Sequence, residues 1–203
     1  MGNEKMQHRI AVFLVVFVCL TAIFSSVTFY IISPKPEQPF MGFGVFSQQG
    51  LQGYVPSNMT ITPPQTFDWN LTVTNRTSKE QFIMVIVRIG NSTTSSPNVT
   101  SPAPTPSELG KMERFVSDGE TSNIDFTWTI ESTNRTGDLV FVNLQINGQS
   151  VSSAPVGAVS GSNFRLIFEL WTFDLDSGSF QYGYPGEISQ VGTWLQVWFS
   201  VSG

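Results

Sequence analysis

The fold expected of this chain rests on residues 66–75, which read TFDWNLTVTN. Apolar and polar side chains alternate throughout this stretch. The apolar positions are Phe67, Trp69, Leu71 and Val73, and the polar positions are Asp68, Asn70, Thr72 and Thr74. Successive side chains of a β-strand point to opposite faces, so a period of two is typical of a half-buried strand. We expect the apolar row to face a core and the polar row to face solvent.

The same alternation returns in three later stretches, residues 124–130, 164–170 and 195–201. Further short strands are expected at Phe40–Phe46, Gln81–Ile89, Lys111–Val116, Leu139–Ile146 and Ser179–Tyr184. Turn-forming pairs separate several of these strands, among them Asp118-Gly119, Asn147-Gly148 and Pro185-Gly186. Many short strands joined by such turns predict an all-β domain, specifically an immunoglobulin-like antiparallel β-sandwich.

The composition limits the partners and cofactors of the chain. It has 203 residues, a formal net charge of -5 and 12% charged residues. This balance gives a nucleic-acid partner no electrostatic support. Cys19 is the single cysteine and His8 is the single histidine, and both precede the expected sandwich. We therefore expect no disulfide, no metal, no cofactor and no histidine-dependent nucleophile.

An apolar segment near the N-terminus indicates a membrane anchor. Residues 10–32 read IAVFLVVFVCLTAIFSSVTFYII and contain no charged side chain. A helix of this length reaches about 34 Å, enough to cross a hydrocarbon core of about 30 Å. Lys5 and Arg9 precede the segment and favour a cytoplasmic N-terminus. A cleaved signal peptide is the main alternative, but its apolar core is usually shorter, about 7–15 residues.

This segment defines the expected domain organisation and location. We expect a cytoplasmic segment 1–9, a single transmembrane helix 10–32 and an extracellular β-sandwich domain 33–203. The protein would then lie in the cell membrane as a single-pass protein with its C-terminal domain outside. Ser25 and Ser26 interrupt the apolar run. Their hydroxyls either bond back to helix carbonyls or form a packing face for another membrane helix.

Residues 91–107, NSTTSSPNVTSPAPTPS, differ in composition from the strands around them. Serine, threonine and proline dominate, and such a composition cannot bury a core. We expect a mobile loop between two strands. A linker between two domains is the alternative, but the part before it holds too few strands to close a sandwich.

Six Asn-x-Thr triplets are candidate glycosylation sites. Their acceptors are Asn58, Asn70, Asn75, Asn91, Asn98 and Asn134. Asn70 falls on the polar face of the strand at residues 67–73, Asn75 follows where that strand ends, and Asn134 falls in an expected turn at Ser132–Gly137. We expect every triplet to lie where a sugar can be accommodated, which suits a glycosylated exterior domain. The alternative is that all six are ordinary polar residues of strands and turns.

Residues suited to catalysis or metal binding are sparse. Asp174 and Asp176 begin like a calcium loop, but Pro185 occupies the position of its final glutamate, so a hairpin turn is expected. Asp125 and Glu169 are a candidate carboxylate pair for glycoside hydrolysis. Strands routinely place acidic residues on outer faces, however, and we expect no catalytic activity of the chain itself.

Aromatic side chains are the remaining lead to a binding surface. Trp194 and Trp198 share one face of the last expected strand, while Leu195, Val197 and Phe199 share the other. The strand is either central and covered on both sides, or it exposes an aromatic patch to a partner protein or sugar. The same alternatives apply to Trp171, Phe173, Phe180, Tyr182 and Tyr184. We take Trp171, Trp194 and Trp198 as possible partner-binding aromatics.

The order of several short motifs resembles the C-terminal exterior domain of the domain of unknown function 1616 family, which is largely archaeal. The similar pieces are EQPFMGFGVF (Glu37–Phe46), GYVPSNMTIT (Gly53–Thr62), WNLTVTN (Trp69–Asn75), RFVSDGE (Arg114–Glu120), FELW (Phe168–Trp171) and WLQVWFSV (Trp194–Val201). The resemblance implies a membrane-attached archaeal sandwich without an assigned activity. Many family members look like multi-span proteins, whereas one span is expected here. The family often has Asn-His-Glu where Asn75 is followed by Arg76 in this chain.

The sequence thus favours a membrane-anchored cell-surface protein with a binding or scaffolding role. Its expected partners are the membrane and other envelope or membrane proteins, and no nucleic acid. Two alternatives remain open. One is an accessory subunit of a membrane enzyme complex, docking through the helix near Ser25 and Ser26. The other is a carbohydrate-active enzyme that uses exterior carboxylates.

Overall fold

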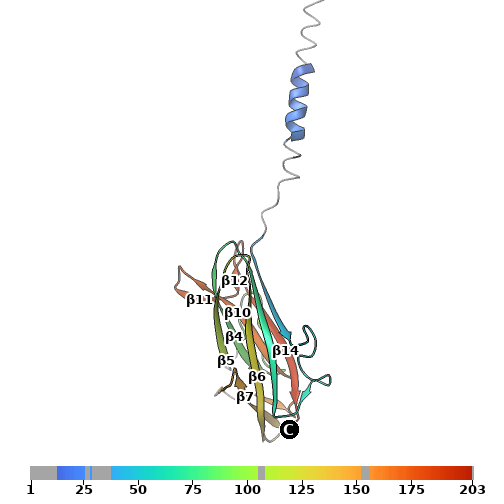
Figure 1. Cartoon of the computed structure of the whole chain (residues 1–203), viewed down its shortest axis with the longest axis vertical. Coiled ribbons are helices and arrows are strands. Elements are labelled where there is room, and N and C mark those ends of the chain that lie inside the picture. Colours follow the sequence, from blue (N-terminus) through green and yellow to red (C-terminus); the bar gives the residue numbers. More distant parts are fainter. Residues whose placement is uncertain (1–12, 26–27, 29–37, 105–107, 152–155, 203) are drawn as a thin grey trace, which may run out of the picture. The chain divides into compact units, whose positions relative to one another are not determined.

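The computed structural model describes residues 13–25, 28, 38–104, 108–151 and 156–202. The chain divides into two compact units, Met1–Glu37 and Gln38–Gly203. In the first unit residues 13–25 are helical (Figure 1). The described helical residues contain no stretch that is both long and apolar enough to cross a membrane. The predicted span 10–32 extends on both sides into residues outside the described ones.

The second unit consists of β-strands. The first of its two large sheets has the order β1-β3-β6-β7-β8, and β9 also pairs with β7. The bounds of these strands are Phe40–Ser47 for β1, Gln65–Arg76 for β3, Thr121–Thr136 for β6, Leu139–Ile146 for β7, Gln149–Ser150 for β8 and Gly157–Val159 for β9. All pairings in this sheet are antiparallel.

The second large sheet has the order β2-β14-β10-β4-β5, and β11 extends it from β10. Its strands are Thr60–Ile61 for β2, Thr193–Val201 for β14, Phe164–Asp174 for β10, Gln81–Gly90 for β4, Glu108–Val116 for β5 and Ser179–Tyr182 for β11. The short strand β2 pairs with β14 in parallel, and the other pairings are antiparallel. A separate ribbon joins β12 (Tyr184–Pro185) to β13 (Gln190–Val191).

The two sheets face each other across one hydrophobic core, so the predicted all-β sandwich is confirmed. The core takes alternate residues from both sheets. Aromatic rings meet between them: the ring centroids of Trp69 and Phe168 lie 6.1 Å apart, and those of Trp128 and Phe199 lie 5.3 Å apart. Rings at these separations attract each other beyond the burial of their area. Figure 1 shows the strands running side by side along the length of this unit.

The opening stretch forms β3 as predicted. Trp69, Leu71 and Val73 are buried in the core, Phe67 packs against it, and the alternate side chains point outward. Two details differ from the sequence-based expectation. Strand β6 continues to Thr136, so Asn134 lies in a strand opposite Phe141 and not in a turn. The two-residue strand β2 was not expected, because a pair of residues carries no periodicity.

Residues 91–104 form a loop between β4 and β5, as predicted, but they are packed. Ala103 is buried, and the loop accepts and donates hydrogen bonds with side chains of β10. Composition gave no sign of this, because the buried partners of the loop, Glu169 and Arg165, lie about 70 residues later in the chain. A low-hydrophobicity loop can be held by a few charged hydrogen bonds in place of apolar burial.

Candidate functional site

The outer face of the second sheet gathers charged and aromatic side chains. In β10, Phe164, Leu166, Phe168 and Leu170 belong to the core. The period of two therefore turns the alternate residues outward: Arg165, Ile167, Glu169, Trp171 and Phe173. The register sets Glu169 beside Trp194 of β14 on one side and Ile86 of β4 on the other.

Glu169 is the centre of a buried polar network on this face. Its side chain is fully buried, and Arg88 Nε donates to its Oε2 atom at 3.0 Å. Trp171 Nε1 donates to the same oxygen at 3.3 Å. The backbone N–H of Ala103 donates to Oε1 at 2.6 Å. A buried carboxylate is tolerated when its charge is paired and its oxygens are hydrogen-bonded, and both conditions hold here.

Arg165 fixes the other half of the loop to the sheet. Its guanidinium donates to the hydroxyl of Ser96 and the amide oxygen of Gln196, each at 2.7 Å, and to the carbonyl of Thr94. The guanidinium carbon also lies 4.8 Å from the ring centroid of Trp198, a cation–π geometry. Burial lowers the pKa of this guanidinium. Arg165 and Glu169 together hold residues 91–104 over the sheet.

The three predicted partner-binding tryptophans lie on this face, and all are half-buried. Trp198 lies under Arg165, and Trp171 bonds to Glu169. The rings of Trp171 and Tyr182 meet edge to face at 5.6 Å. Trp194 is half-buried at the same outer face of β14. Trp171 and Trp198 therefore stabilise the folded domain through these contacts within the chain, independently of any partner that binds this face.

Tyr182 is buried beside this network without a polar partner. It is 8% exposed, and none of the described residues hydrogen bonds to its hydroxyl. Burial, with a smaller effect of the Glu169 charge, raises the pKa of Tyr182 well above its usual value. The described residues supply no acceptor for this hydroxyl. A buried hydroxyl without a hydrogen-bond partner lowers the stability of the fold.

A cluster of four phenylalanines, of which Phe115 is exposed and the other three are half-buried, lies at the far end of the same face. This aromatic platform consists of Phe82 of β4, Phe115 of β5, Phe173 of β10 and Phe180 of β11. Phe82 and Phe115 stack with ring centroids 4.4 Å apart. Phe82 also lies 6.0 Å from Phe173 and 5.2 Å from Phe180. Phe115 is 65% exposed, so the platform presents a ring to solvent.

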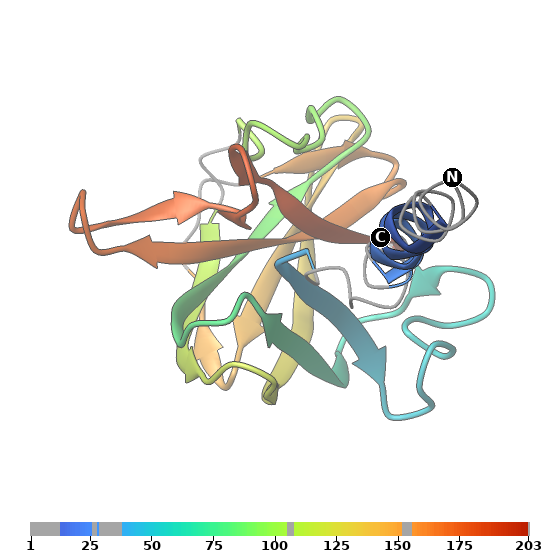
Figure 2. The ribbon, with the colours of Figure 1, turned by 90° about the horizontal axis from the view of Figure 1, so that it is seen from above.

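The β10–β11 hairpin carries Phe173 and Phe180 of the platform. It extends beyond the sandwich in Figure 1 and Figure 2, and Leu175 near its tip is 87% exposed. The Asp174 carboxylate accepts hydrogen bonds from the backbone N–H groups of Asp176 and Ser177. These bonds make the expected hairpin turn, and bonds from Ser177 lower the pKa of Asp174. The described residues contain no group of three or more potential metal-ligating side chains.

The strand register explains why the sequence pattern predicted only two of the four platform residues. Phe173 and Phe180 were candidates, and they face each other as Cα partners. Phe82 and Phe115 are also Cα partners. Phe115 follows the charged residues Lys111 and Glu113 on its face, and the apolar run of β4 around Phe82 does not distinguish an outward row from the core row. The available signal was Phe115-Val116, two adjacent apolar residues that must occupy opposite faces of one strand.

The candidate sugar acceptors fall in different environments. Asn58, Asn98 and Asn134 are exposed. Asn70 is half-buried on the outer face of the first sheet, between Phe46 of β1 and Asp125 of β6. Asn91 is half-buried, and its amide nitrogen donates to the carbonyl of Gly157 at 2.9 Å. The exposed acceptors are the ones that a sugar reaches without breaking a contact.

The expectation that every triplet accommodates a sugar is wrong for Asn75. This residue continues the inward row of β3 and is fully buried. Its amide nitrogen donates to the carbonyls of Lys79 and Val116, at 2.7 and 2.8 Å. Its amide oxygen accepts from the backbone and the hydroxyl of Thr77. The atom to which a glycan would attach is therefore enclosed in the fold.

The carboxylate pair considered for glycoside hydrolysis is also contradicted. Asp125 alternates with the core residues Ile124 and Phe126, so it points out of the first sheet. Glu169 points out of the second sheet in the opposite direction. Catalytic carboxylates of glycosidases stand about 5–10 Å apart across one cleft. Two outer faces of a sandwich are separated by the core itself, so these residues cannot act as such a pair.

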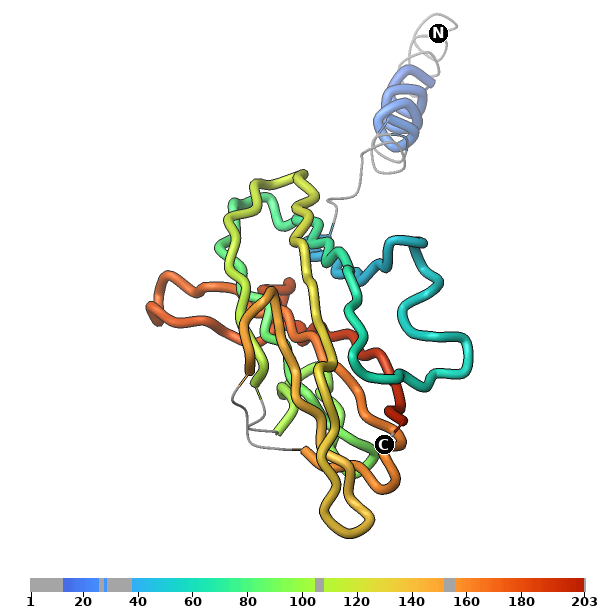
Figure 3. The backbone as a smooth tube through the Cα atoms, turned by 60° about the horizontal axis from the view of Figure 1, so that its bottom comes forward, coloured from blue at the N-terminus to red at the C-terminus, as the bar shows by residue number. Residues whose placement is uncertain are grey.

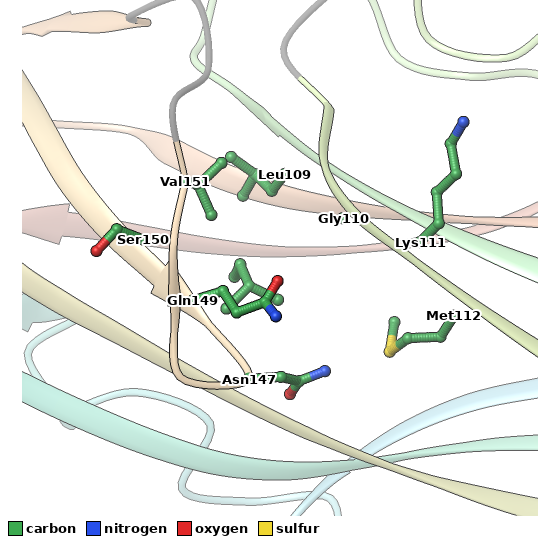
Figure 4. Close-up of a pocket in the computed structure, with 9 residues that line it drawn as sticks. Leu109, Gly110, Lys111, Met112, Asn147, Gln149, Ser150 and Val151 are labelled. Carbon is green, nitrogen blue, oxygen red and sulfur yellow. The ribbon is translucent and has the colours of Figure 1, made fainter.

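A pocket of about 290 Å³ opens at the edge of the sandwich, between β5 and the β7–β8 hairpin. Figure 4 shows Leu109 and Val151 on one side of it, with Asn147 and Gln149 close by. Lys111 is the single charged residue of its lining, and its ammonium lies 3.4 Å from Glu108. This lining offers no group of ionisable side chains that would serve catalysis.

No known protein family and no curated protein matches the chain. Among solved structures, it is similar to the alkylpurine DNA glycosylase AlkC of Pseudomonas fluorescens bound to DNA containing an abasic site analog. The identity is 12% and the TM-score is 0.30. The match covers 59% of this chain and 30% of that chain. Similarity of this degree bears on neither the function nor the partners.

Proposed function

We propose that this protein is a membrane-anchored cell-surface binding or scaffolding protein. Residues 10–32 hold it in the membrane, and an immunoglobulin-like β-sandwich contacts a folded protein of the cell envelope. This role is in line with the resemblance of several short motifs to the exterior domain of the domain of unknown function 1616 family, although no family model matches the chain. The chain performs no chemistry in this role, and its activity is the contact itself.

The aromatic platform is the observation that supports this function most directly. Phe82 and Phe115 stack, Phe180 packs against Phe82 and meets Phe173 edge to face, and Phe115 is 65% exposed. Clustered exposed aromatic side chains are typical of the centres of protein interfaces, where they lose water on contact. Leu175 on the projecting hairpin extends the apolar surface. The network around Glu169 fastens the loop at residues 91–104 to β10 beside the platform.

A photo-crosslink at the platform tests the proposed contact. A photoreactive phenylalanine derivative placed at position 115 of the full chain should crosslink one envelope protein in native membranes, identified by mass spectrometry. Val159 is the matched control position, since it is 64% exposed in β9 of the other sheet. Crosslinking to the same proteins from both positions, or no product from position 115, would overturn the proposed contact. A membrane enzyme as the captured partner would favour the role of an accessory subunit.

The anchor has a separate test. Membranes that contain the full chain are washed with alkaline carbonate, and the chain should stay in the membrane fraction. Release of the intact chain into the wash would refute anchoring through residues 10–32. A shortened product with a new N-terminus after this segment would show that it is a cleaved signal peptide. Neither result bears on the platform contact, which the photo-crosslinking experiment tests separately.

A further inference from the structure

Two adjoining cavities lie beside the start of β3, on a part of the domain that the platform does not reach. They have volumes of about 180 Å³ and 450 Å³ and share Gln49, Gly53 and Phe67 in their linings. Together we call them the amide groove, which is lined by the side chains of Gln48, Gln49, Gln52, Gln65, Phe67 and Asp68. Residues 48–59, which connect β1 to β2 and supply part of this lining, project from the opposite side of the domain to the β10–β11 hairpin in Figure 2 and Figure 3.

The loop over the groove is held in place by its own contacts. The backbones of Ser47 and Gly50 exchange hydrogen bonds of 2.9 and 3.0 Å. The Ser47 hydroxyl donates to the carbonyl of Gln52, and the Tyr54 hydroxyl donates to the carbonyl of Val45. The Tyr54 ring meets Trp69 edge to face at 5.7 Å. The glutamines are thus presented by an ordered turn, and this order lowers the entropy cost of binding a ligand.

Most of the amides in the groove have no partner in the fold. None of the described residues hydrogen bonds to the side-chain amides of Gln49, Gln52 or Gln65. Each amide offers both a donor and an acceptor. Gly53 has a φ of +65°, and a Cβ there would lie 2.7 Å from Gln49 Oε1. Glycine at this position therefore lets the Gln49 amide lie directly over the backbone.

Asp68 adds a fixed acceptor at the wall of the groove. Its Oδ1 accepts from the Thr127 hydroxyl at 2.8 Å, and its Oδ2 accepts weakly from Gln48 at 3.4 Å. Phe67 supplies an apolar surface, and its ring also stacks with that of Trp128 at a centroid distance of 4.6 Å. No lysine, arginine or histidine lines either cavity. The groove therefore disfavours anions and offers paired donors and acceptors beside an aromatic ring.

We propose that the amide groove binds a neutral oligosaccharide. A sugar hydroxyl both donates and accepts hydrogen bonds, as a side-chain amide does. The C–H face of a sugar ring packs against an aromatic side chain. The larger cavity falls within the range of about 300–1,000 Å³ that is usual for small-ligand sites. The ligand is a glycan of the cell envelope or a glycan attached to a neighbouring protein. This site goes beyond the platform contact and does not depend on it.

Binding is measured with the full chain in a zwitterionic detergent, since detergents with sugar headgroups would compete. An array that carries both envelope polysaccharide fragments and Asn-linked glycans separates the two sources of ligand. We expect a dissociation constant of about 0.1–1 mM for the best neutral glycan, as befits a shallow site. Anionic glycans should bind more weakly, because the one charge in the lining is the carboxylate of Asp68.

Variants assign the binding to the groove. The double variant Gln49→Ala/Gln52→Ala should weaken the affinity for the glycan at least about tenfold. Both residues are exposed, so the melting temperature should not change. Gln149→Ala is the matched control, an exposed glutamine of β8 outside the amide groove. Unchanged affinity in the double variant, absence of any bound glycan at millimolar concentration, or preferential capture of an extended peptide would each overturn the proposal.

Discussion

The amide nitrogen of Asn75 in the first sheet donates a hydrogen bond of 2.8 Å to the carbonyl of Val116 in the second sheet. Both residues are fully buried at one end of the sandwich. The backbone takes part as well, because Asn75 N donates to Glu120 O and Gly119 N donates to Asn75 O. A single asparagine thus joins the end of β3 to the turn that leaves β5, and it ties the two sheets together.

Replacement of Asn75 should therefore destabilise the domain. Asn75→Ala removes two donated bonds and leaves the buried carbonyls of Lys79 and Val116 without this donor. We expect the free energy of unfolding to fall by about 3 kcal/mol. For a domain of this size the melting temperature should drop by about 6–12 °C. Asn134→Ala, at an exposed triplet whose side chain hydrogen bonds to none of the described residues, is the control and should shift it by less than about 2 °C. Equal stability of the two variants would contradict the bridging role.

The burial of Asn75 also predicts a pattern of glycosylation. If the exterior domain is glycosylated, sugars should occupy Asn58, Asn98 and Asn134, because these acceptors are exposed. Asn75 should stay unmodified, since its amide nitrogen already serves two carbonyls inside the fold. Glycopeptide mass spectrometry of native material measures the occupancy of each site. A glycan on Asn75 in folded protein would show that this end of the sandwich differs from the structure.

The sequence predicted the strands well, because a period of two encodes both the strand and its buried face. The same period could have placed Asn75 correctly. Positions 69, 71 and 73 point inward, so position 75 must also point inward while the strand continues. The error came from ending the strand at the last apolar residue. A buried asparagine is invisible to a hydrophobic pattern, since its burial depends on partners supplied by distant turns.

The candidate site was harder to predict for a different reason. The aromatic platform joins Phe82 and Phe115 to Phe173 and Phe180, and the two pairs are far apart in the chain. The two pairs meet because β4 and β10 are neighbouring strands in the second sheet. The loop at residues 91–104 is similar, because Arg165 and Glu169 hold it from another strand. Single-sequence periodicity reports which face a residue takes, and it is silent on which strands are neighbours.

The Glu169 network predicts how the loop at residues 91–104 can be released. Glu169→Ala removes the carboxylate that Arg88 Nε and the Ala103 N–H both contact. Loss of one partner of a buried ion pair typically costs about 3–5 kcal/mol, so the free energy of unfolding should fall by a similar amount. Hydrogen exchange at the Ala103 amide should become faster than in the unaltered chain, since its acceptor is gone.

Two further variants make this result specific. Glu169→Gln keeps an oxygen that can accept from Ala103, so amide protection should be largely retained while the ion pair is lost. Glu113→Ala, at an exposed carboxylate of β5, should change neither stability nor exchange at Ala103. Unchanged protection of Ala103 in Glu169→Ala would mean that other contacts hold the loop.

Tyr182 predicts a pH dependence whose sign follows from its burial. The pKa of its hydroxyl is raised by burial and, to a smaller extent, by the charge of Glu169. The folded chain therefore retains this proton at pH values where the unfolded chain, with an ordinary tyrosine pKa of about 10, has lost it. The stability that this group contributes is complete below about pH 10 and is lost as the pH rises further. Tyr54, whose pKa burial also raises, adds to the same trend.

The variant Tyr182→Phe should separate this effect from the rest. It removes a buried hydroxyl without a partner among the described residues, so stability at pH 7 should be unchanged or higher by up to about 1 kcal/mol. The fall in stability between about pH 10 and 11.5 should be shallower than in the unaltered chain, with the remainder due to Tyr54. Urea unfolding across this pH range measures both quantities. Marked destabilisation of Tyr182→Phe at neutral pH would mean that the hydroxyl has a partner in solution, such as an ordered water.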